Sequence, residues 1–163
     1  MVKYLAIIFF SFFFTTGCQK ELLLIEKYEP INEDIYINVV QKNINLNGVA
    51  DGPHANNFLT SLEYWINNNI KTNGFDGLLD INLISIFSSE MLIENGIRIQ
   101  IDLDLDFIIS KSALDSKTLI NFKGSEFVEI FGQFSINDKN IEVNNVMNKL
   151  IERLSNKISE EVN

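Results

Sequence analysis

The sequence predicts an α+β domain, a two-layer sandwich in which two amphipathic helices cover one face of a mostly antiparallel, four-stranded sheet. Three observations support this prediction. In the segment 97–109 every odd position is apolar and the even positions from 98 to 106 are polar, as in a strand with one face exposed to solvent. Two other segments, Ala55 to Ile70 and Ile141 to Val162, repeat apolar residues every three or four positions, as helices do. The expected order of elements is β-α-β-β-β-α.

The first half of the domain begins with a predicted strand over 34–41, where apolar residues occupy every second position. A polar connection is expected over 43–51. The first helix is expected to begin at Pro53. Proline is favourable in the first turn of a helix, because an N–H at this position has no intrahelical acceptor. Gly74 marks a stop after this helix, since glycine readily adopts the left-handed conformation.

The second strand is predicted over 78–89, and its apolar residues change parity. They occupy odd positions up to Leu83 and even positions from Ile84. Because successive side chains of a strand point to opposite faces, this change indicates a β-bulge or burial on both faces.

The second half of the domain carries clear turn and cap signals. Glu94-Asn95-Gly96 predicts a hairpin turn before the alternating strand. A fourth strand is expected over 119–131, and Asn137-Asp138 is expected to cap the last helix.

The first 17 residues predict a cleaved lipoprotein signal peptide. Lys3 precedes an apolar run over 4–14, which is too short to cross a bilayer, since spanning needs about 20 residues. Small residues then lead to Cys18, the only cysteine. This pattern resembles the bacterial lipobox, although Thr15 stands where leucine is usual. The resemblance implies lipidation of Cys18; an ordinary secretory signal or a retained N-terminal anchor is the alternative.

The expected location is the outer membrane, with the chain anchored by lipid and facing the periplasm. Several acyl chains at about 0.8 kcal/mol per buried CH₂ hold a protein stably on a membrane. The residue after the cysteine is Gln19 and not aspartate. In enteric bacteria, this pattern directs lipoproteins to the outer membrane. The inner membrane remains the alternative. Residues 18–33 then form a lipid-anchored tether, and residues 34–163 form a single domain.

The net charge of −9 argues against several partner classes. Nucleic acids are bound by surfaces rich in lysine and arginine, so no nucleic-acid partner is expected. Anionic lipid would repel an acidic surface as well. The expected membrane contact is therefore the N-terminal lipid anchor alone.

The acidic residues of the alternating strand do not predict a metal site. An EF-hand loop that began at Asp102 would need glycine at its sixth position and glutamate at its twelfth, where Phe107 and Ala113 stand. Neighbours on one face of a strand lie about 6.8 Å apart, which suits a single ion poorly. The pattern is typical of a solvated sheet face that resists aggregation.

No catalytic constellation is visible in the sequence. His54 is the only histidine, so it can build neither a multi-histidine metal site nor a triad without a clear nucleophile beside it. Trp65 lies in the apolar stripe of the first helix and is expected in the core. We therefore predict no catalytic residue, no metal and no cofactor.

Two families resemble this chain. The pattern Pro53-His54, Trp65, Gly74-Phe75-Asp76-Gly77 and Ile81, with a C-terminal helix over 140–162, is similar to a family of small, uncharacterised alphaproteobacterial lipoproteins. The order of elements also resembles the lipopolysaccharide-assembly lipoprotein (LptE-like) family, which plugs an outer-membrane barrel. This second resemblance implies a role in membrane assembly. Lipopolysaccharide binding is not expected, because the solvent-facing side of the strand 97–109 carries aspartates where basic residues would be needed.

These features together predict a non-enzymatic, periplasm-facing lipoprotein that serves as an accessory or adaptor protein in envelope assembly or transport. An envelope protein is the expected partner. The alternatives are a binding module for a small apolar ligand or lipid between sheet and helices, and a hydrolase that uses the aspartate pairs. The expected partner-contact face comprises Arg98, Gln100, Asp102, Asp104, Asp106 and His54.

Overall fold

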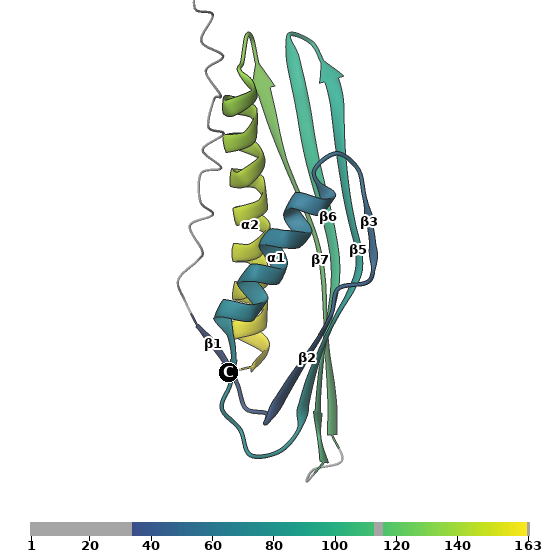
Figure 1. Ribbon diagram of the computed structural model, residues 1–163, viewed down its shortest axis with the longest axis vertical. Helices are drawn as coiled ribbons and strands as arrows, with labels where there is room; N and C mark the ends of the chain where they lie inside the picture. The colour runs from purple at the N-terminus through teal and green to yellow at the C-terminus, as the bar shows by residue number, and fades with distance from the viewer. Residues whose placement is uncertain (1–33, 113–115, 163) are drawn as a thin grey trace, which may run out of the picture.

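The computed structural model describes residues 34–112 and 116–162, and it shows two helices packed on one face of a long sheet (Figure 1). This confirms the α+β class and the placement of both helices on the same side. Cys18, the signal peptide and the tether lie outside the described residues. No helix within the described ranges is long and apolar enough to cross a membrane.

Three antiparallel strands of 16 residues each form most of the main sheet: β5 (Leu78–Ile93), β6 (Gly96–Lys111) and β7 (Ser116–Phe131). At about 3.3 Å per residue, each is about 50 Å long. The predicted turn between β5 and β6 is confirmed: Ile93 pairs with Gly96, and Asn95 in the connection adopts the left-handed conformation with a φ of 62°.

Of the two interpretations of the parity change in β5, a bulge or burial on both faces, the structure shows the bulge. The register with β6 shifts between Leu83 and Ser85, and the extra residue, Ile84, is exposed. After the bulge the even-numbered residues of β5 face the helices, as the burial of Ile86 shows. This shift turns Phe87 and Met91 to the helix-free face of the sheet.

The strand layout corrects the sequence-based prediction. The expected strand over 34–41 is split into β1 (Ile35–Ile37) and β2 (Gln41–Asn45), because the N–H of Val39 donates to the carbonyl of Ile37 and closes a tight turn. The segment 43–51, expected to be a polar connection, contains the last three residues of β2 and all of β3 (Val49–Asp51). Both pair in parallel with β5, so the main sheet is mixed and five-stranded.

The first helix, α1 (Ala55–Asn69), leads directly into β4 (Ile70–Thr72), which pairs in parallel with β1. Lys42 fixes this junction, because its Nζ donates to the carbonyls of Ile66 and Ile70 at 2.9 and 2.7 Å. The small β1–β4 sheet is separate from the main sheet. The two-layer description therefore holds only for the main sheet and the helices.

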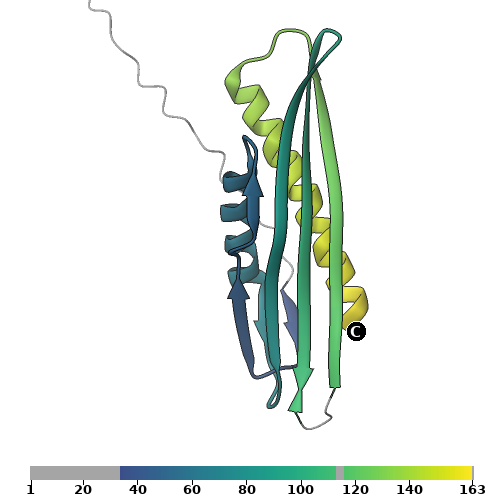
Figure 2. The same ribbon diagram turned by 90° about the vertical axis from the view of Figure 1, so that its right-hand side faces the viewer.

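The second helix, α2 (Ile136–Val162), begins with a reciprocal cap. Ser135 Oγ accepts from the N–H of Asp138, and Asp138 Oδ2 accepts from the N–H of Ser135. The cap residue is thus Ser135 and not the expected Asn137-Asp138 pair. Figure 2 views the helix-free face and shows α2 crossing diagonally behind the sheet until it emerges beyond the lower half of β7.

The core fills the space between the sheet and the helices. Trp65, expected in the core, is fully buried together with Phe58 of the same helix and Phe107 of β6. Leu150 and Leu154 of α2 are equally inaccessible. One cluster of buried side chains from both helices and the sheet thus covers one face of the sheet with apolar contacts.

Candidate partner-binding face

The helix-free face carries a polar network along the middle of β6. Asn121 Nδ2 on β7 donates to Asp104 Oδ1 at 3.1 Å and to Asp106 Oδ1 at 2.7 Å. Lys123 Nζ lies 2.9 Å from Asp104 Oδ2. These contacts tie the acidic residues of β6 to its neighbour and so fix their positions.

The same network continues through Gln100. Its Nε2 donates to Asp102 Oδ1 at 3.0 Å and to Ser125 Oγ at 3.2 Å. All five predicted residues of β6 therefore share one face, as their alternation indicates. Within residues 34–112 and 116–162, no three His, Cys, Asp or Glu side chains gather to hold a metal ion.

A group of exposed apolar side chains begins beside Gln100 and Asp102 and extends to the β5–β6 turn. We call it the distal patch: Phe87, Met91, Phe127 and Phe131. Their exposed fractions are 45%, 46%, 49% and 61%. The strand register places Met91 opposite Arg98, and Arg98 opposite Glu129. The distal patch therefore surrounds an arginine on the helix-free face.

Arg98 lies over the ring of Phe127 in the distal patch. Its guanidinium carbon lies 3.8 Å from the centroid of the Phe127 ring, a cation–π contact. Its Nη1 is 3.8 Å from Glu129 Oε1, beyond hydrogen-bond distance. Aromatic residues, methionine and arginine are the types enriched at protein interfaces, so this composition favours a protein-binding surface.

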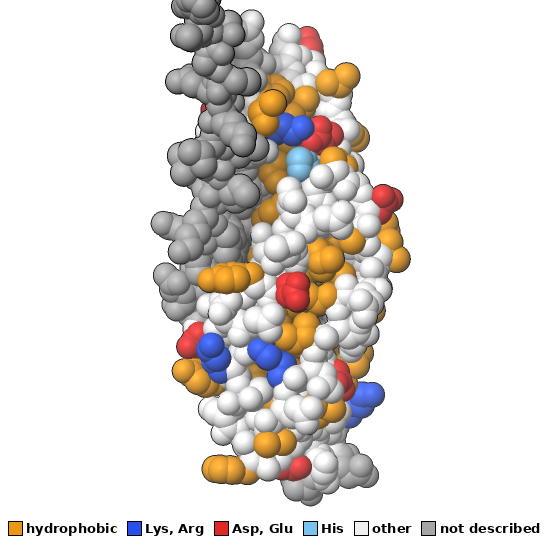
Figure 3. Space-filling model, in the orientation of Figure 1, with side chains coloured by type: hydrophobic (Ala, Val, Ile, Leu, Met, Phe, Trp, Pro, Cys, Tyr) orange, Lys and Arg blue, Asp and Glu red, His pale blue; other side chains and the backbone are white. Residues whose placement is uncertain are grey.

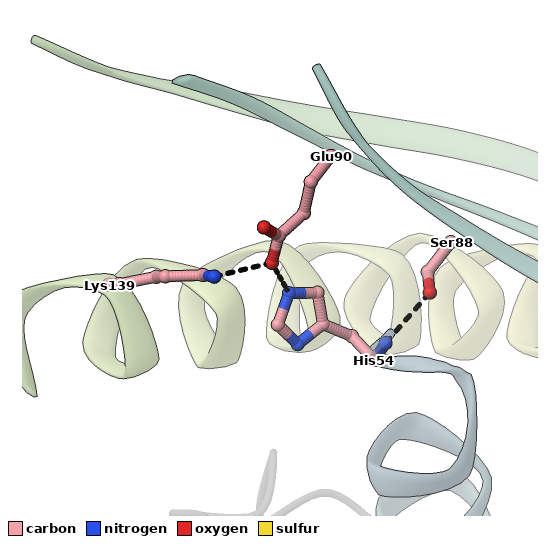
Figure 4. Close-up of polar contacts among 4 residues, drawn as sticks. All are labelled: His54, Ser88, Glu90 and Lys139. Atoms are coloured by element: carbon pink, nitrogen blue, oxygen red, sulfur yellow. Dashed lines mark hydrogen bonds and ion pairs between the residues drawn. The ribbon is translucent and has the colours of Figure 1, made fainter. Parts of the chain in front are cut away.

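His54 lies on the other side of the sheet, in a polar cluster (Figure 4). Its Nε2 is 2.6 Å from Glu90 Oε1, which Lys139 Nζ also contacts at 2.5 Å. The backbone N–H of His54 donates to Ser88 Oγ at 2.8 Å. The cluster joins the start of α1 to the last turn-proximal residues of β5 and to the start of α2. The structure does not bring His54 together with the predicted residues of β6.

Within this cluster His54 and Ser88 are buried, whereas the side chains of Glu90 and Lys139 are partly exposed. His54 is 8% exposed, and a small pale-blue area in Figure 3 marks the part that remains visible from the helix side. Burial by itself would raise the pKa of Glu90, but the hydrogen bonds and charges of Lys139 and His54 outweigh it and hold that pKa below its usual value. The arrangement therefore stabilises the ionised carboxylate.

Replacing Glu90 with glutamine is expected to lower the free energy of unfolding by about 1 kcal/mol at pH 7, since Lys139 and His54 lose their charged partner. Because the pKa of Glu90 is depressed in the folded state, its contribution is complete above the unfolded pKa of about 4.3 and is lost as the pH falls through the folded value. Urea unfolding at pH 7 and pH 3 measures both effects. An equal difference between wild type and Glu90→Gln at the two pH values would contradict this account.

Of three comparisons with known proteins, only the comparison with solved structures found matches. No protein-family model matches the chain, and no curated protein matches it significantly. Its fold is similar to a minor lipoprotein from Acinetobacter baumannii, with a TM-score of 0.48 and 10% identity over 74% of this chain and 93% of that one.

Two further solved structures are similar. A neuraminyllactose-binding hemagglutinin homologue from Helicobacter pylori has a TM-score of 0.48 and 14% identity, over 84% of this chain and 87% of that one. The rare lipoprotein B from Shewanella oneidensis has a TM-score of 0.45 and 10% identity, over 76% of this chain and 97% of that one.

Proposed function

We propose that this protein is a non-enzymatic, lipid-anchored envelope lipoprotein that faces the periplasm from the outer membrane. It acts as an accessory or adaptor protein in envelope assembly or transport, and it docks an envelope partner through the helix-free face of its sheet.

The distal patch is the observation that carries this proposal. Its four large apolar side chains stand around Arg98 on the face that the helices leave uncovered. A patch of exposed apolar side chains that is surrounded by polar residues is typical of a protein interaction site. The adjoining network, from Gln100 to Asp106, supplies a polar rim whose side chains are already fixed by hydrogen bonds.

The expected anchor adds to this function by restricting where the domain can go. A tether of about 16 residues, 18–33, spans at most about 55 Å when it is fully extended. Confinement to this distance raises the effective concentration of the domain near proteins of the same membrane. The acidic charge of the chain then favours a partner with a basic surface.

A charge placed in the distal patch tests the proposal. Phe127→Asp, introduced into the full chain with its signal peptide, is expected to reduce the co-purified envelope partner by about tenfold, because burying the new carboxylate costs at least about 1.4 kcal/mol. The partner is identified by mass spectrometry after purification from solubilised membranes.

Phe75→Asp is the matched control, since Phe75 is completely exposed in the loop between β4 and β5. Thermal unfolding checks that both variants fold. Equal recovery of the partner with both variants would contradict docking through the distal patch. An intact envelope in a deletion strain, with no co-purifying partner for the wild type, would contradict the adaptor function itself.

A further inference from the structure

The edge of the main sheet at β7 is open along part of its length. Among the residues that the structure describes, β7 pairs only with β6, so one side of its backbone has no strand beside it. At the opposite edge, two short strands, β2 and β3, cover β5. An edge strand with free N–H and C=O groups is a template for the addition of another strand.

The second helix lies beside only one half of the open edge of β7. Arg153 of α2 reaches the edge, where its Nη1 donates to the carbonyl of Ser125 at 3.1 Å and contacts Glu126 Oε1. From this point the helix runs alongside the lower half of β7, as Figure 2 shows. Neither of the two described helices lies beside the edge of the upper half, residues 127–131.

The direction of the backbone groups in this upper half follows from one hydrogen bond. The N–H of Gly132 donates to the carbonyl of Asn95, so it points towards β6. Because backbone groups alternate along a strand, even-numbered residues face β6 and odd-numbered residues face outward. The bond from Arg153 to the carbonyl of Ser125 agrees with this assignment. Phe127, Glu129 and Phe131 thus direct their N–H and C=O groups to the open edge.

The sequence of this half contains few features that discourage pairing. Residues 127–131 include no proline, lysine or glycine, and four of the five are Phe, Val or Ile, which favour strands. The lower half, by contrast, holds Lys117, Lys123 and Gly124. Lysine on an edge is a common way to prevent strand addition, so protection is concentrated where α2 already lies.

We propose that an extended segment of the partner pairs with residues 127–131 of β7 as an additional strand. The segment carries a basic residue flanked by apolar residues at alternate positions. This inference rests on the proposed function and specifies how the partner docks and what its segment contains.

The chemistry of the segment follows from the side chains it would meet. On the helix-free face, residues opposite Phe127 and Phe131 would extend the distal patch, which favours apolar types. The residue opposite Glu129 would face a carboxylate that is about one-third exposed and has no hydrogen-bond contact to Arg98. Like charges in this position are destabilising, so a basic residue fits best.

Two synthetic peptides test the mode of binding on the full chain: acetyl-Thr-Ile-Thr-Lys-Thr-Ile-Thr-amide and its counterpart with glutamate in place of lysine. The basic peptide is expected to bind about threefold or more tightly than the acidic one. In amide hydrogen exchange, the N–H groups of Phe127, Glu129 and Phe131 are expected to slow about tenfold when the basic peptide is bound. Those of Val128 and Ile130, which face β6, are expected to be slow already.

A pair of variants separates strand addition from contact through side chains. Glu129→Thr and Glu129→Pro both remove the carboxylate, but only the proline removes the outward N–H, which an edge strand tolerates without loss of its bonds to β6. We expect Glu129→Pro to bind the basic peptide about tenfold more weakly than Glu129→Thr.

Equal binding of the basic peptide by Glu129→Thr and Glu129→Pro would overturn strand addition. Unchanged hydrogen exchange at the amides of Phe127, Glu129 and Phe131 would overturn it as well. Either result would do so even if Phe127→Asp abolished recovery of the partner. A dimer formed through β7 that excludes the peptide would overturn the proposed occupant, because a second copy would then fill the edge. Loss of the partner in Phe127→Asp, with both peptide results as expected, supports both proposals.

Discussion

Replacing Phe107 with alanine is expected to lower the free energy of unfolding by about 3–5 kcal/mol, a large share of the about 5–15 kcal/mol that stabilises a typical domain. Phe107 is completely buried in the C-terminal half of β6, between Ile81 of β5 and Ile120 of β7 in the strand register. The substitution removes its ring from the layer under the helices and leaves a cavity that long, paired strands cannot close. Urea unfolding monitored by circular dichroism measures the loss.

Phe127→Ala is the matched control for this prediction, because it is the same substitution in the neighbouring strand at a half-exposed position. It is expected to cost at most about 1 kcal/mol, which corresponds to the lost contact with Arg98. Similar losses for the two variants would show that the helix-covered side of the sheet is not the core of the protein.

Gly52→Ala is expected to destabilise the protein by about 2–5 kcal/mol. Gly52 has a φ of 102°, a conformation that costs other residues about 1–2 kcal/mol, and a Cβ built there would lie 1.9 Å from the carbonyl oxygen of Ser88. Relief of this overlap requires a shift between the start of α1 and β5, which adds about 1–3 kcal/mol. The shift would also disturb the bond from His54 to Ser88 Oγ.

Gly132→Ala distinguishes the cost of the positive φ from the cost of the steric overlap. Gly132 also has a positive φ, 78°, but a Cβ there would have no atom within 4 Å. Its substitution is expected to cost only about 1 kcal/mol. If differential scanning calorimetry gives equal decreases in Tm for Gly52→Ala and Gly132→Ala, the close packing of Gly52 on β5 has no energetic consequence.

Local sequence signals were sufficient for the long antiparallel strands. The alternation in 97–109 identified β6 and its wet face because burial on one side imposes a period of two. The change of parity at Leu83 located the bulge, and Asn95 located the turn. Each of these features depends on side-chain direction or backbone conformation within a few residues, which is information that a single segment contains.

The parallel strands could not be predicted in the same way. β2 has the sequence Gln-Lys-Asn-Ile-Asn, which has a low intrinsic preference for strands, and its pairing with β5 joins residues 37 positions apart. Likewise, Ile70 continues the apolar stripe of α1 but forms β4 because β1 lies beside it. In both places tertiary pairing overrides local preference.

The candidate site was predicted in part. The register places the five polar residues of β6 on one face, as expected, whereas His54 is paired with Glu90 on the other side. The distal patch was missed because its members come from β5 and β7 and become neighbours only through the strand register. One signal was present in the sequence: residues 127–131 have apolar side chains at both odd and even positions.

The central claim is that an envelope partner contacts the helix-free face, and site-specific photo-crosslinking in native membranes tests it most directly. A photoreactive phenylalanine analogue is placed at position 127 or, as the control, at position 75 in the loop. We predict one discrete crosslinked envelope protein at position 127, which disappears when Met91 is replaced with aspartate, and none at position 75. The same products at both positions, or a product at 127 that survives Met91→Asp, would contradict the account.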